Sequence, residues 1–135
     1  MDLSNAIKTR HSVRSYTDRP IEGEVKDQLI SCIEQCNEDS GIRFQLVTDE
    51  PEAFSGFMAR YGKFFNVRNY IAVIGKNSAD SQQACGYYGE KIVLTAQALG
   101  LNTCWVAMTY SKNKTKVHLE EGEKILFVIA VGYGT

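Results

Sequence analysis

The sequence predicts an α/β (α+β) domain in which a central mixed sheet is flanked by helices. Three observations lead to this prediction. Two long segments, residues 22–36 and 81–99, repeat their apolar residues at helical spacing. A continuous apolar run at 70–74 is typical of a strand that is buried on both faces. A second apolar run, at 125–131, supplies another strand late in the chain.

The first part of the chain contains two predicted helices. Residues 2–9 place apolar side chains on one face, and either Asp2 or Ser4 can cap this short helix. Residues 22–36 form the second helix, with acidic residues near its start. Gly41 follows it and suits a position that needs positive φ.

The middle of the chain alternates strands and helices. A brief strand is predicted at 44–47, and Pro51 fits the first turn of a helix at 52–60. After the buried strand already described comes the longest helix, 81–99, whose apolar coverage is unusually broad. Gly100 is suited to end that helix.

The last part contains two strands separated by a polar segment. Residues 102–107 form the first strand, 111–118 form a loop or a helical turn, and 125–131 form the last strand. The chain has no internal repeat and no linker. We therefore expect residues 1–135 to form a single domain, which is a usual size for one hydrophobic core.

Composition excludes several classes of function. A net charge of -1, from 15 basic and 16 acidic residues, gives no general attraction to nucleic acid or to anionic membranes. The longest apolar stretch is too short to span a bilayer, and residues 1–4 show no signal-peptide pattern. We therefore expect a cytoplasmic protein with no nucleic-acid or membrane partner and with reduced, largely structural thiols at Cys32, Cys36, Cys85 and Cys104.

A basic cluster follows the first predicted helix. Arg10, His11, Ser12 and Arg14 bring two permanent cations, an imidazole and a hydroxyl within five residues. Guanidinium groups bind phosphate through paired donors, and a serine hydroxyl can complete the shell. Taken alone, the cluster favours a solvated surface, on which Arg14 pairs with Asp18 or with a more distant acid, because short basic clusters are common.

Two glycine-containing segments also leave alternatives open. Residues 100–105 join the longest helix to a strand and bring Trp105 to the end of the sheet, where it either contacts a ligand or fills the core. Residues 86–89 flank two tyrosines with glycines inside a helix. Because glycine costs about 1 kcal/mol there relative to alanine, the pattern indicates either a close approach or aromatic packing.

Other catalytic patterns are absent from the sequence. It contains neither a G-x-S-x-G nucleophile motif nor a Walker-type phosphate loop. His11 and His118 are too few and too far apart to suggest a metal centre. Glu120 and Glu121 belong to an acidic run that we expect to be solvated.

Three segments in register resemble the FMN-dependent nitroreductase family. After its first helix, that family carries R-[RH]-S-x-[RK], then an aromatic residue and a proline, and residues 10–20 follow this pattern with Tyr16 and Pro20. The long helix of the family ends A-x-x-L-G-L-x-[TS], which residues 96–103 match. Residues 131–134 and the strand before them resemble the closing I-x-x-x-G-Y.

The resemblance implies a nitroreductase-like fold with FMN as cofactor. It also implies NAD(P)H as electron donor, a nitroaromatic, quinone or similar small molecule as acceptor, and a homodimer. Because the hydride chemistry belongs to the flavin, no catalytic acid or base is assigned. The implied cofactor-binding residues form a phosphate group and a ring group: Arg10, His11, Ser12 and Arg14, and then Trp105, Val106, Ala107 and Met108.

Two departures from the family pattern matter. Most members carry P-[ST]-x-x-N-x-Q-P-W between the second helix and the first strand, whereas this chain has Glu38 at the asparagine position, so that contact is not transferred. Members also continue past G-Y, so we expect residues 1–135 to lack the C-terminal portion of the family. Two alternatives stay open: a flavin- or nucleotide-binding protein without turnover, and an interaction domain that retains the fold.

Overall fold

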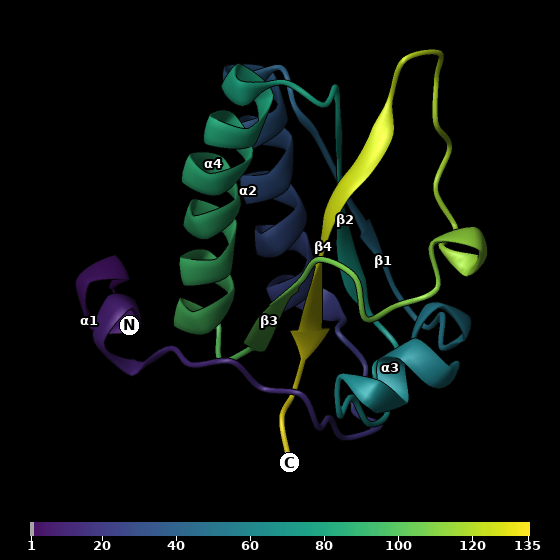
Figure 1. The fold of residues 1–135 in the computed structure, drawn as a ribbon. Helices are drawn as coiled ribbons and strands as arrows, with labels where there is room; N and C mark the ends of the chain where they lie inside the picture. The colour runs from purple at the N-terminus through teal and green to yellow at the C-terminus, as the bar shows by residue number, and fades with distance from the viewer. Residues whose placement is uncertain (1) are drawn as a thin grey trace.

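A computed structural model describes residues 2–135 as a sheet with helices on both sides (Figure 1). Two long helices, α2 (Gly23–Ser40) and α4 (Ala79–Ala98), lie side by side against one face of the sheet. The short α1 (Leu3–Thr9) packs beside the end of α4, and α3 (Phe57–Tyr61) lies on the opposite side of the sheet. The remaining elements are the strands β1 (Arg43–Val47), β2 (Tyr70–Gly75), β3 (Asn102–Val106) and β4 (Lys124–Gly132), and the 3-10 turns η1 (Glu52–Phe54) and η2 (Lys112–Lys114).

The four strands pair in the order β1-β2-β4-β3, and every ladder between them is antiparallel. All six residues of β2 are buried, as the apolar run at 70–74 predicted. The predicted α+β domain with a central sheet between helices is confirmed. Its ladders are antiparallel rather than mixed because β4 inserts between β2 and β3, the two strands that the α4 crossover leaves parallel to each other. Within residues 2–135, parallel pairing is limited to isolated bridges such as that of Ser12 with Thr103.

Apolar side chains on the two faces of the sheet form two separate cores. On one face, Leu29 of α2 and Ile92 of α4 are fully buried over Ile71 of β2. On the other face, the rings of Phe54 and Phe64 meet edge to face with centroids 5.1 Å apart. Full burial of a side chain of this size contributes about 1.5–3 kcal/mol, so both faces stabilise the sheet.

Local signals set most helix ends as predicted. Asp2 caps α1, because its carboxylate accepts a hydrogen bond from the Asn5 N–H at 2.9 Å. Gly41 ends α2 with a φ of 72°, and Gly100 follows α4 with a φ of 89°. Glycine adopts this left-handed backbone without the steric cost that other residues meet.

Two boundaries differ from the prediction. α2 continues to Ser40 rather than ending near residue 36, because no earlier residue provides the left-handed conformation that Gly41 supplies. The helix predicted at 52–60 is split into η1 and α3. The split occurs because Gly56 is extended, with φ -92° and ψ -176°, and cannot continue the first helical turn.

A buried carboxylate joins three segments of the fold. Glu50 accepts hydrogen bonds from the Glu52 N–H and from the Tyr70 hydroxyl, both at 2.7 Å. The same hydroxyl oxygen accepts the Lys116 N–H at 3.0 Å. Burial raises the pKa of Tyr70, so the hydroxyl stays protonated and donates to the carboxylate. One side chain of β2 therefore fixes both η1 and the segment after η2.

Tyr70→Phe should destabilise the protein. The substitution removes the hydroxyl hydrogen bond to the Glu50 carboxylate, which keeps the Glu52 N–H, and it leaves the Lys116 N–H without its partner; the loss of a buried hydrogen bond costs about 1–3 kcal/mol. We expect the free energy of unfolding in urea to fall by that order.

Tyr110→Phe is the matched control, because the buried hydroxyl of Tyr110 has no hydrogen-bond partner among residues 2–135. Its removal should leave the free energy of unfolding unchanged or slightly raised. Equal losses in the two variants would contradict the role given to Tyr70.

Candidate functional site

Residues 12–17 form an extended segment that runs below the end of β4, between α1 and α3 (Figure 1). The Val13 N–H donates to the Thr103 carbonyl of β3 at 3.0 Å, and the Thr17 N–H donates to the Tyr133 carbonyl at 2.8 Å. Backbone hydrogen bonds to two distant parts of the chain therefore fix the path of the segment. This segment carries Ser12 and Arg14 of the basic cluster, and Arg10 and His11 directly precede it.

Tyr16 is a buried residue that supports the backbone of the basic cluster. Its side chain is 3% exposed, and its hydroxyl donates to the Val13 carbonyl at 2.5 Å. Burial, and then the nearby Cys104 thiol, raises the pKa of Tyr16, whereas the charges of Arg14 and Arg10 act to lower it. The hydroxyl therefore remains a donor, and both guanidinium groups lie within electrostatic range of the same atom.

The last residues of the chain pack directly on this segment. The Gly134 N–H donates to Asn102 Oδ1 at 2.9 Å, and a Cβ on Gly134 would stand 2.8 Å from Val13 Cγ1. A Cβ on Gly132 would stand 3.0 Å from the ring of Tyr16. The basic cluster, the start of β3 and the end of β4, which the sequence places far apart, therefore meet at one place.

Arg10 is the member of the cluster whose charged group is enclosed. Its Nε and Nη2 atoms are buried and have no hydrogen-bond partner among residues 2–135. A buried donor without an acceptor costs about 1–3 kcal/mol, and a charged one costs more. An anion with two free oxygens satisfies both nitrogens in the paired geometry that guanidinium favours. The residues present therefore fit the phosphate of FMN.

The other members of the cluster are open to solvent. His11, Ser12 and Arg14 are exposed. The guanidinium carbon of Arg14 lies 6.0 Å from the centre of the Phe64 ring. Within the described chain, Arg14 forms no ion pair with Asp18 or with another acid, so its charge is available to a ligand.

Trp105 directs its side chain away from the cluster and into the contact between β3 and α4. Its indole N–H donates to Glu90 Oε1 at 3.2 Å, and its ring meets Phe127 edge to face with centroids 5.9 Å apart. A Cβ on Gly89 would stand 2.4 Å from Trp105 Cη2. Gly89 therefore allows α4 to approach the indole ring, and the side chain of Trp105 packs between β3 and α4.

β3 offers a ligand its backbone edge, because the side chains of the strand pack into the cores. Val106 is buried in the core on the opposite face from Trp105. β3 is an edge strand, and the Thr103 carbonyl points outward to Val13. Because backbone groups alternate along an antiparallel strand, those of Trp105 face the same outer edge. Any contact of Trp105 with a ring must therefore come from the strand edge, whereas the side chain of Val106 lies in the core and its backbone faces β4.

Ala107 and Met108 begin the loop that follows β3. Both are exposed, Met108 at 71%. The loop rests on the end of α3, where a Cβ on Gly62 would stand 2.7 Å from the Thr109 side chain. The four residues predicted to line the ring therefore follow one another along the end of β3 and into the loop after it. They begin two residues after Thr103, which forms a bridge with Ser12 of the basic cluster.

Sequence reasoning missed two asparagines that support the site. Asn66 has a φ of 59°, and its amide donates to the Tyr16 carbonyl at 3.0 Å and to Asp18 Oδ1 at 2.7 Å. Asn102 accepts the Gly134 N–H. Asparagine tolerates positive φ better than most residues, but no local pattern names partners 32 or 50 positions away.

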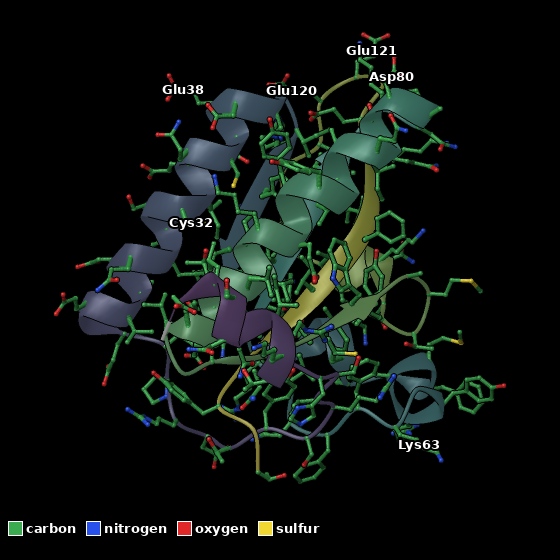
Figure 2. All side chains as sticks on the ribbon, turned by 90° about the vertical axis from the view of Figure 1, so that its left-hand side faces the viewer. Cys32, Glu38, Lys63, Asp80, Glu120 and Glu121 are labelled. Atoms are coloured by element: carbon green, nitrogen blue, oxygen red, sulfur yellow. The ribbon has the colours of Figure 1, made fainter. Side chains whose placement is uncertain are left out.

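Four exposed acidic residues lie away from the basic cluster. Figure 2 shows Glu38, Asp80, Glu120 and Glu121 at the end of the molecule where α2 finishes and α4 begins, opposite the end where Lys63 adjoins α3. Glu120 and Glu121 are exposed, as predicted. Glu38 is also exposed and lies at the end of the molecule away from the candidate site.

The cysteines take no part in the site as metal ligands or as disulfides. All four are free, as predicted. Burial, followed by the neighbouring Cys32 thiol, raises the pKa of Cys36 to about 11, which makes it an unreactive thiol. Residues 2–135 contain no cluster of three metal-ligating side chains. None of the helices formed by these residues has the length and apolar character needed to cross a bilayer.

Comparisons with known proteins bear on the fold and the family. A family model described as "Putative TM nitroreductase" matches residues 2–135. A nitroreductase family protein from Clostridium novyi NT is 18% identical with a TM-score of 0.74, over 100% of this chain and 86% of that one. An FMN-dependent nitroreductase from Clostridium difficile R20291 is 20% identical with a TM-score of 0.72, over 96% and 86%. A Parabacteroides distasonis protein described as "Putative NADH dehydrogenase/NAD(P)H nitroreductase" is 27% identical with a TM-score of 0.70, over 98% and 86%. A search of curated protein sequences gave no significant match.

Gly89→Ala should destabilise the protein although alanine favours helices. The added methyl group meets the rigid indole of Trp105, and overpacking of this kind costs about 1–3 kcal/mol. Chemical denaturation should report a lower free energy of unfolding, and the near-ultraviolet circular dichroism of Trp105 should change.

Gly86→Ala is the control on the same helix, because a Cβ at Gly86 meets nothing within 4 Å. It should stabilise the protein by up to about 1 kcal/mol through helix propensity alone. Stabilisation by both substitutions would contradict the close packing of Gly89 against Trp105.

Proposed function

Because this chain belongs to the nitroreductase family, we propose that it is an FMN-dependent oxidoreductase that transfers electrons from NAD(P)H to nitroaromatic, quinone or similar acceptors. The related structures support the cofactor and the donor, since one is named as FMN-dependent and another as an NAD(P)H nitroreductase. The four free cysteines suit a reducing compartment, and we propose that the protein works in the cytoplasm.

The enclosed guanidinium of Arg10 is the observation that carries this proposal. A solvated basic surface would leave its donors in water, whereas here two nitrogens are buried without an acceptor. Proteins rarely retain such groups without a functional reason. A phosphate monoester, which carries up to two negative charges, both pairs with the donors and compensates the buried charge.

The chain's own residues divide the work of holding the cofactor. Arg10 and Arg14 bind the phosphate, with the Ser12 hydroxyl and His11 completing the phosphate and ribityl contacts. The edge of β3 at Trp105 and the residues that follow it, Val106, Ala107 and Met108, line the ring. Tyr16 positions the cluster through the Val13 carbonyl. Bound FMN supplies the hydride chemistry, while the protein supplies position and electrostatics.

We also propose that the protein acts as a homodimer. Leu3 and Ile7 on α1 are 42% and 63% exposed, and Tyr87 on α4 is 72% exposed. Leu3, Tyr87 and Leu94 line a groove of about 410 Å³ between these packed helices, and Ile7 lies on the same short helix as Leu3. Apolar side chains gathered in this way favour a protein partner, and a second copy of the chain offers the same surface.

The first test of the function is the binding of FMN. Arg10→Gln should raise the Kd for FMN at least ~100-fold, because two hydrogen bonds to charged groups contribute about 3 kcal/mol or more together. Quenching of flavin fluorescence on titration measures the Kd. The apoprotein variant should unfold at no lower urea concentration, since the lost group has no partner.

Lys76→Gln is the control, because it removes one exposed positive charge beyond the end of β2. Its Kd for FMN should match that of the wild type. Unchanged FMN affinity in Arg10→Gln would contradict the phosphate assignment, and no uptake of FMN by the wild type would favour an interaction domain.

The second test separates a reductase from a flavin binder. Adding NADH or NADPH to the FMN-loaded protein without oxygen should bleach the visible flavin absorption, and adding a quinone should restore it. A spectrum that stays unchanged with both donors would favour a binding protein without turnover.

The third test addresses the homodimer. Light scattering during gel filtration should report a dimer for the wild type and a monomer for Ile7→Glu combined with Tyr87→Glu, because buried unpaired carboxylates oppose association. Leu119→Glu alters an exposed apolar residue elsewhere and should leave the dimer intact. A wild-type monomer would contradict this part of the proposal.

A further inference from the structure

α3 and the segment that carries η2 lie on the side of the sheet away from α2 and α4 (Figure 1), and residues of both line a second groove. Its volume is about 490 Å³, which suits a small organic molecule. The lining residues are Met58, Met108, Tyr110, Ser111, Lys112, Asn113 and Lys114. Met108 belongs to the ring group proposed above, so the groove starts where the flavin ring is expected to end.

The apolar part of the groove suits an aromatic ring. Met58 and Met108 are 38% and 71% exposed, although thioether side chains are usually buried. Methionine sulfur is polarizable and makes favourable contacts with aromatic groups. Two exposed methionines on one groove therefore favour a flat, conjugated ligand.

The polar part of the groove is positively charged. Lys112 and Lys114 are exposed, and neither forms an ion pair with a described residue, whereas the nearby Lys116 pairs with Glu52 at 3.2 Å. None of the lining residues is acidic. The two lysine charges are therefore left for a ligand that brings its own negative charge.

The groove is held in shape without a ligand. The Ser111 N–H donates to the Ala53 carbonyl at 2.7 Å, and the Lys116 N–H donates to the buried Tyr70 hydroxyl. Tyr110 is 3% exposed, and its buried hydroxyl has no partner among residues 2–135. Burial raises the pKa of Tyr110 to about 12, so the hydroxyl stays protonated. A preformed site loses little conformational entropy on binding.

We propose that this groove is the acceptor subsite and that it selects aromatic or quinone acceptors that carry a carboxylate or sulfonate. Met58 and Met108 contact the ring, and Lys112 and Lys114 pair with the anionic substituent. This inference rests on the proposed function. For a nitroaromatic acceptor, one NAD(P)H and one proton from water convert the nitro group to a nitroso group, releasing NAD(P)⁺ and one water, so two electrons pass per turnover.

The test compares para-nitrobenzoate with para-nitrobenzamide, which has nearly the same shape and no charge. With the FMN-loaded wild type, KM for the benzoate should be about 3- to 10-fold lower, the range that two exposed ion pairs support. Lys112→Gln combined with Lys114→Gln should remove this difference and leave kcat/KM for the benzamide within about 2-fold. NMR titration of the same protein with each compound should give the same order of Kd values.

Lys26→Gln combined with Lys76→Gln is the matched control, because it removes two positive charges, one on α2 and one beyond the end of β2, that do not line the groove. It should keep the preference for the benzoate. Equal KM values for the two compounds in the wild type would overturn the inference while leaving the reductase intact. A rise in KM for NADPH but not for NADH in the Lys112 and Lys114 variant would overturn it too, since the lysines would then bind the donor.

The binding measurement keeps the inference separate from the proposed function. If the chain takes up no FMN, the reductase proposal fails, and NMR titration of the protein alone with para-nitrobenzoate still tests the groove. Shifts at Met58 and Met108 that depend on the two lysines would support an anionic aromatic site. Absence of such shifts would overturn it.

Discussion

The path of residues 12–17 is the constraint on which the rest of the candidate site depends. This segment has no regular secondary structure, so its backbone groups must find partners elsewhere. Thr103 in β3 and Tyr133 after β4 provide them, and the Tyr16 hydroxyl closes the turn onto the Val13 carbonyl. Glycine is required at position 134, where the last residues of the chain pack on this segment, because a Cβ there would overlap Val13. The site is therefore built by packing between distant segments.

This construction explains how a buried cation can be tolerated. The unpaired nitrogens of Arg10 oppose folding, but the core on both faces of the sheet, with residues such as Leu29 and Tyr70 fully buried, contributes far more. Functional sites commonly retain such locally unfavourable groups, because the unfavourable energy is relieved when the ligand binds. A guanidinium already fixed beside the strand loses little entropy on meeting a phosphate, which is an advantage that a solvated arginine lacks.

The sequence predicted the local features of the fold better than its long-range contacts. The apolar run of β2 and the glycines after α2 and α4 act through their immediate neighbours, so their structures could be foreseen. The break at Gly56 and the burial of Arg10 could not, because both depend on segments packed from elsewhere. Trp105 lies between these cases. Sequence alone left it as either a ligand contact or a core residue, and Gly89, itself unusual within a helix, turned out to be its packing partner.

The geometry of β3 separates the proposed cofactor contacts from the proposed acceptor contacts. Successive side chains of the strand point to opposite cores, Trp105 toward α4 and Val106 toward the other face, so only its backbone edge meets a ligand there. A backbone edge gives the same hydrogen bonds whatever the side chains are, which suits a cofactor of fixed structure. Selectivity for the acceptor then falls to the loop after β3, where Met108 and the η2 lysines can vary without disturbing either core.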